Sequence, residues 1–251
     1  MRAIWTGAIG FGLVNIPIKI YSATQTSSLD LDMLDRKDHA NIKYKRVNEK
    51  SGKEVSWDNI VKGYLLKDKY IVLEDADFEE ALPEKNKMIN LQSFVKLAEI
   101  DSIYYDTPYY LEPQKSGEKA YQLLLKALEK SKMAGLGTFV MRNVENLAII
   151  KPYKDILVLN KLRFEEEIRG LEEISTAPAT RIKKEEMDMA MKLIKLNSKE
   201  FDISAYKNEY SNELLKIIKQ KSKGKRATIR KINVENTKAS DLLEKLKASL
   251  A

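Results

Sequence analysis

Apolar and polar residues alternate along much of the first two-thirds of the chain, and this pattern predicts strands. Isoleucines stand at positions 16, 18 and 20, while Lys19 and Tyr21 face the other way, so this pattern predicts a strand over 15–21 with one buried face. Other alternating or short apolar runs predict strands over 42–47, 70–73, 88–95, 104–111, 137–142, 147–152 and 156–164. A mainly β fold with some α-helix is therefore expected.

Prolines, turns and glycines refine the strand pattern. Pro108 lies in the middle of an aromatic-rich stretch, which predicts an edge strand or a bend. Residues 151–155 separate two apolar strands by a length typical of a hairpin. Ser51-Gly52-Lys53 predicts a turn. Gly7, Gly10 and Gly12 are followed by neither Gly-Lys-Ser/Thr nor a helical pattern, so they favour strand bending or tight packing over a phosphate-binding loop.

Apolar residues recur at helical spacing in several later segments. The first helix, centred on 120–128, would be capped by Ser116 and ended by Gly135. Two more, over 187–194 and 210–218, follow a polar link and carry apolar stripes too narrow for helices that are buried on all sides. These two helices must pack on the β domain or on a partner chain. A short amphipathic helix over 240–250 is predicted at the C-terminus.

Charge is segregated along the chain. The net charge is +7, and the acid-free stretch 214–234 alone carries eight cations, which leaves the remainder near −1. Residues 36–53 hold seven basic residues against two acids, whereas 68–84 are almost entirely acidic among their charged residues. Each run alone is typical of a solvated loop, but opposite runs so close together indicate one face suited to a polyanion.

Composition limits the chemistry. There is no cysteine and only one histidine, so disulfides, thiolate metal sites, histidine cages and a catalytic triad are not expected. No pair of acids stands out, so an enzyme is not indicated, although a hydrolase built on two carboxylates stays open. No long apolar run is present, and a soluble, unexported protein is expected.

Several strings of residues are specific enough to indicate a family. The strongest is the opening, Trp5-x-Gly7-x-Ile9-x-Phe11-Gly12-Leu13-Val14-Asn15-Ile16-Pro17. Others are Ile103-Tyr104-Tyr105-Asp106-x-x-Tyr109-Tyr110-Leu111-Glu112-Pro113 and Val158-Leu159-x-x-Leu162-Arg163. These strings resemble bacterial Ku, the homodimeric DNA-end-binding protein of non-homologous end joining. The similarity extends over residues 1–222. One departure is that Asp38, Asn48 and Ser51 stand where many relatives carry cysteines, so no metal is expected.

The resemblance implies a Ku-type β-barrel core over 1–175 with a DNA-encircling bridge at about 24–70. It also implies a helical arm over 176–222 and a basic tail over 223–251 that ends in the short helix. Two chains would form a ring around duplex DNA, without catalysis and without a cofactor, in the cytoplasm and associated with the nucleoid. An ATP-dependent end-joining DNA ligase is the implied further partner.

Candidate binding residues follow from the charge pattern and the resemblance together. The expected DNA contacts are Lys37, Lys43, Lys45, Arg46, Lys50 and Lys53 in the bridge, Lys132 and Arg142 in the barrel, and Lys223, Lys225, Arg226, Arg230 and Lys231 in the tail. The expected ligase contacts are Leu242, Leu243, Leu246 and Leu250, unless that helix folds back on the barrel. A metal-dependent nuclease and a general duplex-coating protein are the alternative functions.

Overall fold

The structure, a computed structural model, describes residues 1–81, 87–172 and 174–224. The described chain divides into two compact units. One comprises Met1–Thr26 and Asp32–Gly170, and the other comprises Ser27–Leu31 together with the chain from Leu171 onward.

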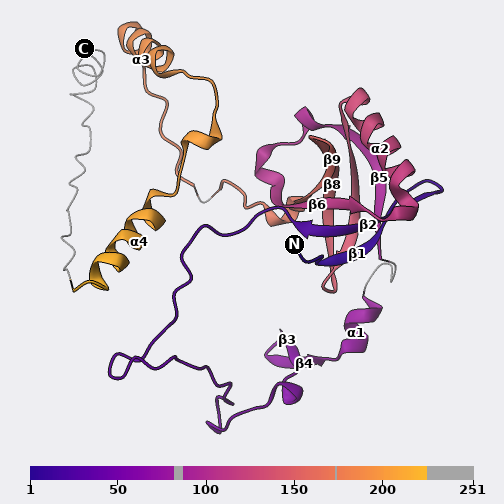
Figure 1. Ribbon diagram of the computed structural model, residues 1–251, viewed down its shortest axis with the longest axis vertical. Helices are drawn as coiled ribbons and strands as arrows, with labels where there is room; N and C mark the ends of the chain where they lie inside the picture. The colour runs from indigo at the N-terminus through magenta and orange to yellow at the C-terminus, as the bar shows by residue number, and fades with distance from the viewer. Residues whose placement is uncertain (82–86, 173, 225–251) are drawn as a thin grey trace. The chain divides into compact units, whose positions relative to one another are not determined.

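Seven strands of the first unit form a closed barrel in the order β1-β2-β6-β9-β8-β7-β5 (Figure 1). All neighbouring pairs are antiparallel except β1 and β5, which close the barrel in parallel. The strands are β1 (Trp5–Phe11), β2 (Val14–Ser22), β5 (Met88–Lys96), β6 (Tyr105–Pro113), β7 (Met133–Met141), β8 (Val144–Tyr153) and β9 (Ile156–Leu162). The predicted mainly β fold is confirmed, and so is the hairpin between β8 and β9.

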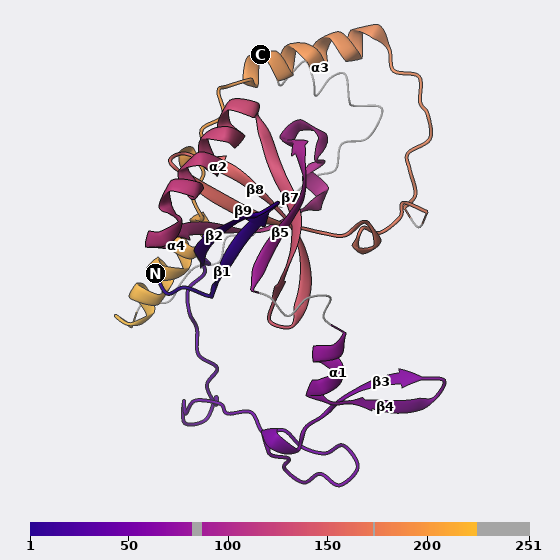
Figure 2. The ribbon, with the colours of Figure 1, turned by 90° about the vertical axis from the view of Figure 1, so that its right-hand side faces the viewer.

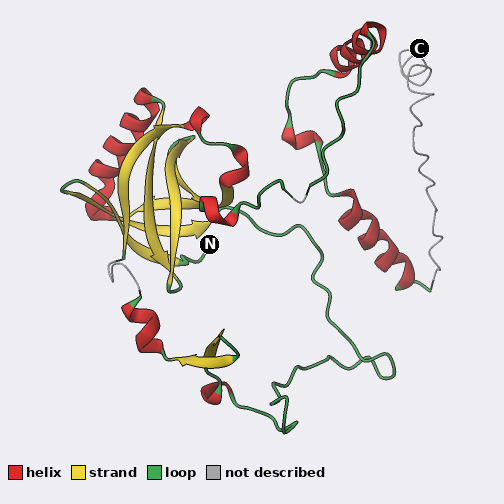
Figure 3. Ribbon diagram, turned by 180° about the vertical axis from the view of Figure 1, so that it is seen from behind, coloured by secondary structure: helices red, strands yellow, loops and turns green. Residues whose placement is uncertain are grey.

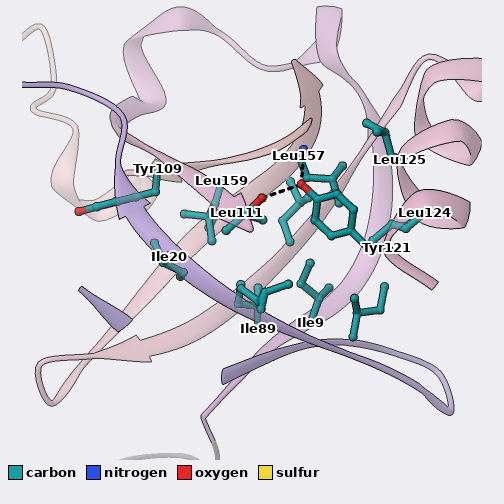
Figure 4. Close-up of a cluster of buried hydrophobic side chains, with 14 of the residues drawn as sticks. Ile9, Ile20, Ile89, Tyr109, Leu111, Tyr121, Leu124, Leu125, Leu157 and Leu159 are labelled. Carbon is teal, nitrogen blue, oxygen red and sulfur yellow. Dashed lines mark hydrogen bonds between the residues drawn. The ribbon is translucent and has the colours of Figure 1, made fainter. Parts of the chain in front are cut away.

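The barrel interior is filled by the alternating apolar residues of its strands. Ile16, Ile18 and Ile20 of β2 are fully buried, as their spacing predicts. Helix α2 (Glu118–Ser131) packs against β2, β7 and β8 and adds Leu124 and Leu125 to the same core (Figure 4). Strand β2 is not adjacent to β7 or β8 in the barrel order, so the helix contacts separate parts of the barrel wall. Its buried side chains complete the core.

Both predicted ends of α2 are wrong. Ser116 lies in a short 3-10 turn, and Gly117 takes the N-cap position without a side-chain hydrogen bond. The helix ends at Ser131, because Lys132 adopts a left-handed conformation with φ of 56°. Gly135 instead lies in β7, where a Cβ atom would come 2.8 Å from the Leu91 side chain.

The interpretation of Pro108 is half right. Strand β6 pairs with β2 on one side and with β9 on the other, so it is not an edge strand. The pairing with β9 shifts register between Tyr105 and Pro108, which is the irregularity that a proline without an N–H group imposes. The bend is therefore real, and closure of the barrel removes the edge.

The segment between β2 and β5 contains little regular structure (Figures 2 and 3). It includes the two-stranded antiparallel sheet of β3 (Lys62–Leu66) and β4 (Lys69–Leu73), followed by α1 (Asp75–Glu80). The predicted strand over 42–47 is wrong. The N–H of Ile42 donates to Met33, while the carbonyl of Arg46 accepts from Val55, so its two ends belong to different turns.

The second unit contains the two predicted arm helices, α3 (Lys184–Asn197) and α4 (Glu209–Lys221). Asn208 caps α4 by accepting a hydrogen bond from the N–H of Ser211, and its amide donates to the Ser27 hydroxyl at 3.0 Å. The apolar stripe of each helix is largely exposed: Ile194 is 61% and Tyr210 75% accessible.

Candidate nucleic-acid interface

The basic segment 36–53 is held by two short turns closed through side-chain acceptors. In the first turn, the Asp35 carboxylate accepts the N–H of Lys37 at 2.7 Å, and the Asp38 carboxylate accepts that of Ala40 at 2.9 Å. The N–H of His39 donates to the carbonyl of Asp35. Such turns present the intervening side chains to solvent, and all of this stretch is exposed.

Asn48 organises the second turn. Its side-chain oxygen accepts the N–H groups of Lys50 and Ser51, both at 3.0 Å, and the Ser51 hydroxyl at 3.2 Å. Gly52 has φ of 66° and donates its N–H to the Asn48 carbonyl, which confirms the turn expected here. Asp38, Asn48 and Ser51 thus close their turns by hydrogen bonds.

Not every cation of the basic segment is equally available. Lys45 forms an ion pair with Glu54 at 2.7 Å, and the Arg46 guanidinium lies 4.3 Å from the centroid of the Trp57 ring. Four lysines are exposed and form no ion pair within the described residues, and these are Lys37, Lys43, Lys50 and Lys53. These four ammonium groups are free to meet phosphate oxygens.

The two barrel candidates lie at exposed turns. Lys132 is the left-handed residue after α2, and Arg142 has φ of 57° in the two-residue turn between β7 and β8. No hydrogen bond or ion pair within the described parts of the chain joins either residue to the basic segment. Their role in DNA binding stays a prediction.

The tail candidates are only partly within the described chain. Lys223 follows α4 and is exposed, and Lys216 pairs with Glu213 inside that helix. The remaining candidates lie outside the described residues, and these are Lys225, Arg226, Arg230, Lys231, Leu242, Leu243, Leu246 and Leu250.

Three further cations on the barrel surface were missed from the sequence. Lys161 and Arg163 both approach the carboxylate of Asp106, at 3.5 and 3.8 Å. Lys151 lies with its ammonium 5.1 Å from the centroid of the Tyr105 ring, and burial lowers the pKa of this lysine. Asp106 and Tyr105 are far from these cations in the sequence, and the contacts form only because β6, β8 and β9 pair. For Lys151, the sequence offers one indication, which is the combination of lysine and tyrosine at 151–154.

Neither a metal site nor a membrane span is found in the part of the chain that the structure describes. No three acidic or histidine side chains converge there as metal ligands would. No helix of the described ranges is long and apolar enough to cross a bilayer.

Comparison with known proteins identifies the family. The model of the Ku70/Ku80 beta-barrel domain matches residues 10–189. The chain is 40% identical to the Non-homologous end joining protein Ku of Archaeoglobus fulgidus, over 100% of this chain and 98% of that protein. It is 34% identical to the protein of that name from Coxiella burnetii, over 99% of this chain and 94% of the relative. The relative of that name from Bacillus subtilis is 35% identical, over 91% of this chain and 75% of its own length. The chain, with its closed barrel and the family's sequence over most of its length, belongs to the Ku family.

Proposed function

We propose that this chain forms a homodimeric ring that binds the ends of double-stranded DNA without sequence preference. In this proposal the ring recruits and stimulates an ATP-dependent end-joining DNA ligase in the repair of double-strand breaks. The observation that carries the proposal is the near full-length similarity to proteins named Non-homologous end joining protein Ku. The protein acts where its DNA is, on the nucleoid in the cytoplasm.

The chemistry of the basic segment suits this function. Broken ends have arbitrary sequence, so a protein that accepts all of them must contact phosphates rather than base edges. The exposed lysines at 37, 43, 50 and 53 provide such contacts from a segment with little regular structure. Lys45, Arg46, Lys132, Arg142 and the tail cations are the further proposed contacts. Binding of this kind weakens steeply as salt rises, because released counterions drive it.

Two surfaces support a dimer. An isolated two-stranded sheet is at best marginally stable in water, yet the sheet of β3 and β4 exposes Tyr64, Leu65, Tyr70 and Val72. Helices α3 and α4 likewise expose their apolar stripes. Patches of this kind mark sites of protein association, and a second copy of the chain is the proposed partner.

The alternative functions fit less well. A metal-dependent nuclease needs clustered acids, and the described residues contain no such group. We propose a non-catalytic role, which is supported by the similarity to proteins named Non-homologous end joining protein Ku. A protein that merely coats duplex DNA would not need a free end to load, which is the point at which the two binding functions differ.

Topology provides the decisive test. The full-length protein is mixed with linear or covalently closed circular duplex of one sequence, and binding is measured by gel shift. Binding to the linear form only is expected. Ends ligated shut after binding should trap the protein on the circle. Rapid loss of pre-bound protein from that circle, or equal affinity for both forms, would overturn the threaded ring.

A further inference from the structure

A hollow of about 240 Å³ opens on the outer surface of the barrel over the neighbouring strands β6, β9 and β8. Ala23, which follows β2, also lines it. Cross-strand pairing explains its composition. Val158 of β9 pairs with Tyr110 of β6 on one side and with Lys151 of β8 on the other. Leu157 and Leu159 point into the barrel core, so the intervening Val158 and the next alternate residue, Asn160, face outward.

Lys151 is the cation of the hollow. It is half-buried, and burial lowers its pKa because no carboxylate of the described residues pairs with it. Its ammonium lies 5.1 Å from the centroid of the Tyr105 ring. Burial removes water from the ammonium group, and an anion in the hollow would stabilise its positive charge in place of that water.

Asn160 provides a second polar group. The residue is only 8% exposed, and its side-chain amide makes no hydrogen bond within the described chain. No fully buried side-chain nitrogen or oxygen of the described residues lacks a partner, so the amide must reach the surface of the hollow. A buried amide without a partner costs free energy unless a ligand or water completes its hydrogen bonds.

The walls of the hollow are aromatic and apolar. The rings of Tyr110 and Tyr153 line it, and Pro108 and Val158 form part of the remaining surface. A second ammonium, that of Lys154, lies 5.5 Å from the centroid of the Tyr153 ring. Proteins that bind single-stranded nucleic acids combine aromatic rings with cations, because bases stack on the rings and phosphates contact the cations. The tyrosines and lysines of the hollow form such a combination.

We propose that this hollow accepts one unpaired nucleotide from a single-stranded extension at a DNA end. Lys151 meets its phosphate, a tyrosine ring stacks on its base, and the Asn160 amide bonds to the base edge. This inference rests on the proposed function, since it adds a preference for extended ends to a protein that binds ends. An amide that both donates and accepts matches a base edge, whereas the carboxylate groups of an acidic peptide only accept hydrogen bonds and cannot bond to the amide oxygen.

The test compares two DNAs and a small probe on the full-length protein. Fluorescence anisotropy measures affinity for a blunt duplex and for the same duplex with a short oligo-dA extension. Tyrosine fluorescence measures binding of dAMP alone and of an oligoglutamate peptide. The variants are Lys151→Met and Asn160→Leu, and the control is Lys126→Met, which removes one exposed charge from α2. Thermal melting checks that all variants fold.

The wild type should bind the extended duplex about tenfold more tightly than the blunt one. Lys151→Met and Asn160→Leu should abolish this advantage and the response to dAMP, while their affinity for the blunt duplex stays unchanged. Lys126→Met should bind both DNAs and dAMP as the wild type does.

Equal wild-type affinity for the two DNAs would overturn the inference and leave end binding intact. So would variants that bind both DNAs equally less tightly. A Lys151-dependent response to oligoglutamate rather than dAMP would assign the hollow to a protein partner. Absence of all duplex binding, with the dAMP response retained, would overturn the proposed function alone.

Discussion

At the scale of single residues, Tyr121 ties helix α2 to the barrel. Its hydroxyl donates to the carbonyl of Leu111 at 2.6 Å and accepts the N–H of Leu157 at 2.7 Å (Figure 4). Tyr121→Phe keeps the ring but leaves both backbone groups without a partner in the core. We expect the free energy of unfolding to fall by about 1–3 kcal/mol, measured by urea denaturation followed by circular dichroism. Unchanged stability would mean that water replaces the hydroxyl.

The same residue gives a pH prediction. Burial raises the pKa of the Tyr121 phenol above its ordinary value of 10.0. The group's contribution to stability is therefore complete below the unfolded-state pKa and is lost as pH rises through the higher folded-state pKa. The stability difference between wild type and Tyr121→Phe should shrink above pH 10, measured by urea denaturation at each pH. A difference that stays constant over this range would contradict the assignment.

Gly137 in β7 is required by a close approach of two strands. A Cβ atom there would overlap the carbonyl oxygen of Asn90 and lie 2.9 Å from the Cα atom of Leu91, so the backbone of β5 would have to move. Gly137→Ala should lower the free energy of unfolding by about 1–3 kcal/mol in chemical denaturation. Gly63→Ala is the matched control, because its Cβ atom would meet nothing closer than 3.5 Å. Equal effects of the two substitutions would refute the packing argument.

At the scale of elements, the pattern predicts what local sequence determines. Strand β2 and the arm helices are predicted because their apolar residues follow one period and neighbours along the chain decide the conformation. Residues 42–47 follow a strand period as well, but within the described residues only isolated bridges form at this segment, so no strand develops. Strand β3 has a glycine and no clear alternation, and it forms only because β4 follows it across a tight turn.

The exposed apolar stripes of the arm helices give a prediction about assembly. Ile194 of α3 is exposed in the single chain, and we expect a second copy to cover it. Ile194→Glu should shift the protein from dimer to monomer in sedimentation velocity at low micromolar concentration, with the barrel still folded. Lys192→Glu on the opposite side of α3 changes the charge more and should leave the dimer intact. A folded wild-type monomer at this concentration would contradict the dimer.

At the scale of the whole molecule, the charge pattern of the sequence indicates the basic segment but not the hollow on the barrel surface. Cations that are neighbours along the chain, such as Lys43 and Lys45, are visible as a charge run. Lys151 and Asn160 acquire their chemistry only when β6, β8 and β9 pair and withdraw them from water. Burial and cross-strand neighbours are tertiary properties, so no charge count along the chain could have indicated them.

The last prediction separates two roles of the C-terminal region. Five cations between Lys223 and Lys231 are expected to bind phosphates, and the leucines at 242, 243, 246 and 250 are expected to bind the ligase. Deletion after Thr237 should leave DNA affinity nearly intact and reduce stimulation of the ligase, measured by end-joining assays. Deletion after Ser222 should also weaken DNA binding and lower its salt dependence, because each phosphate that is no longer neutralised takes about 0.9 from the log–log slope. If the shorter deletion unfolds the protein or abolishes the dimer, the terminal segment is structural, and the two roles are not separable.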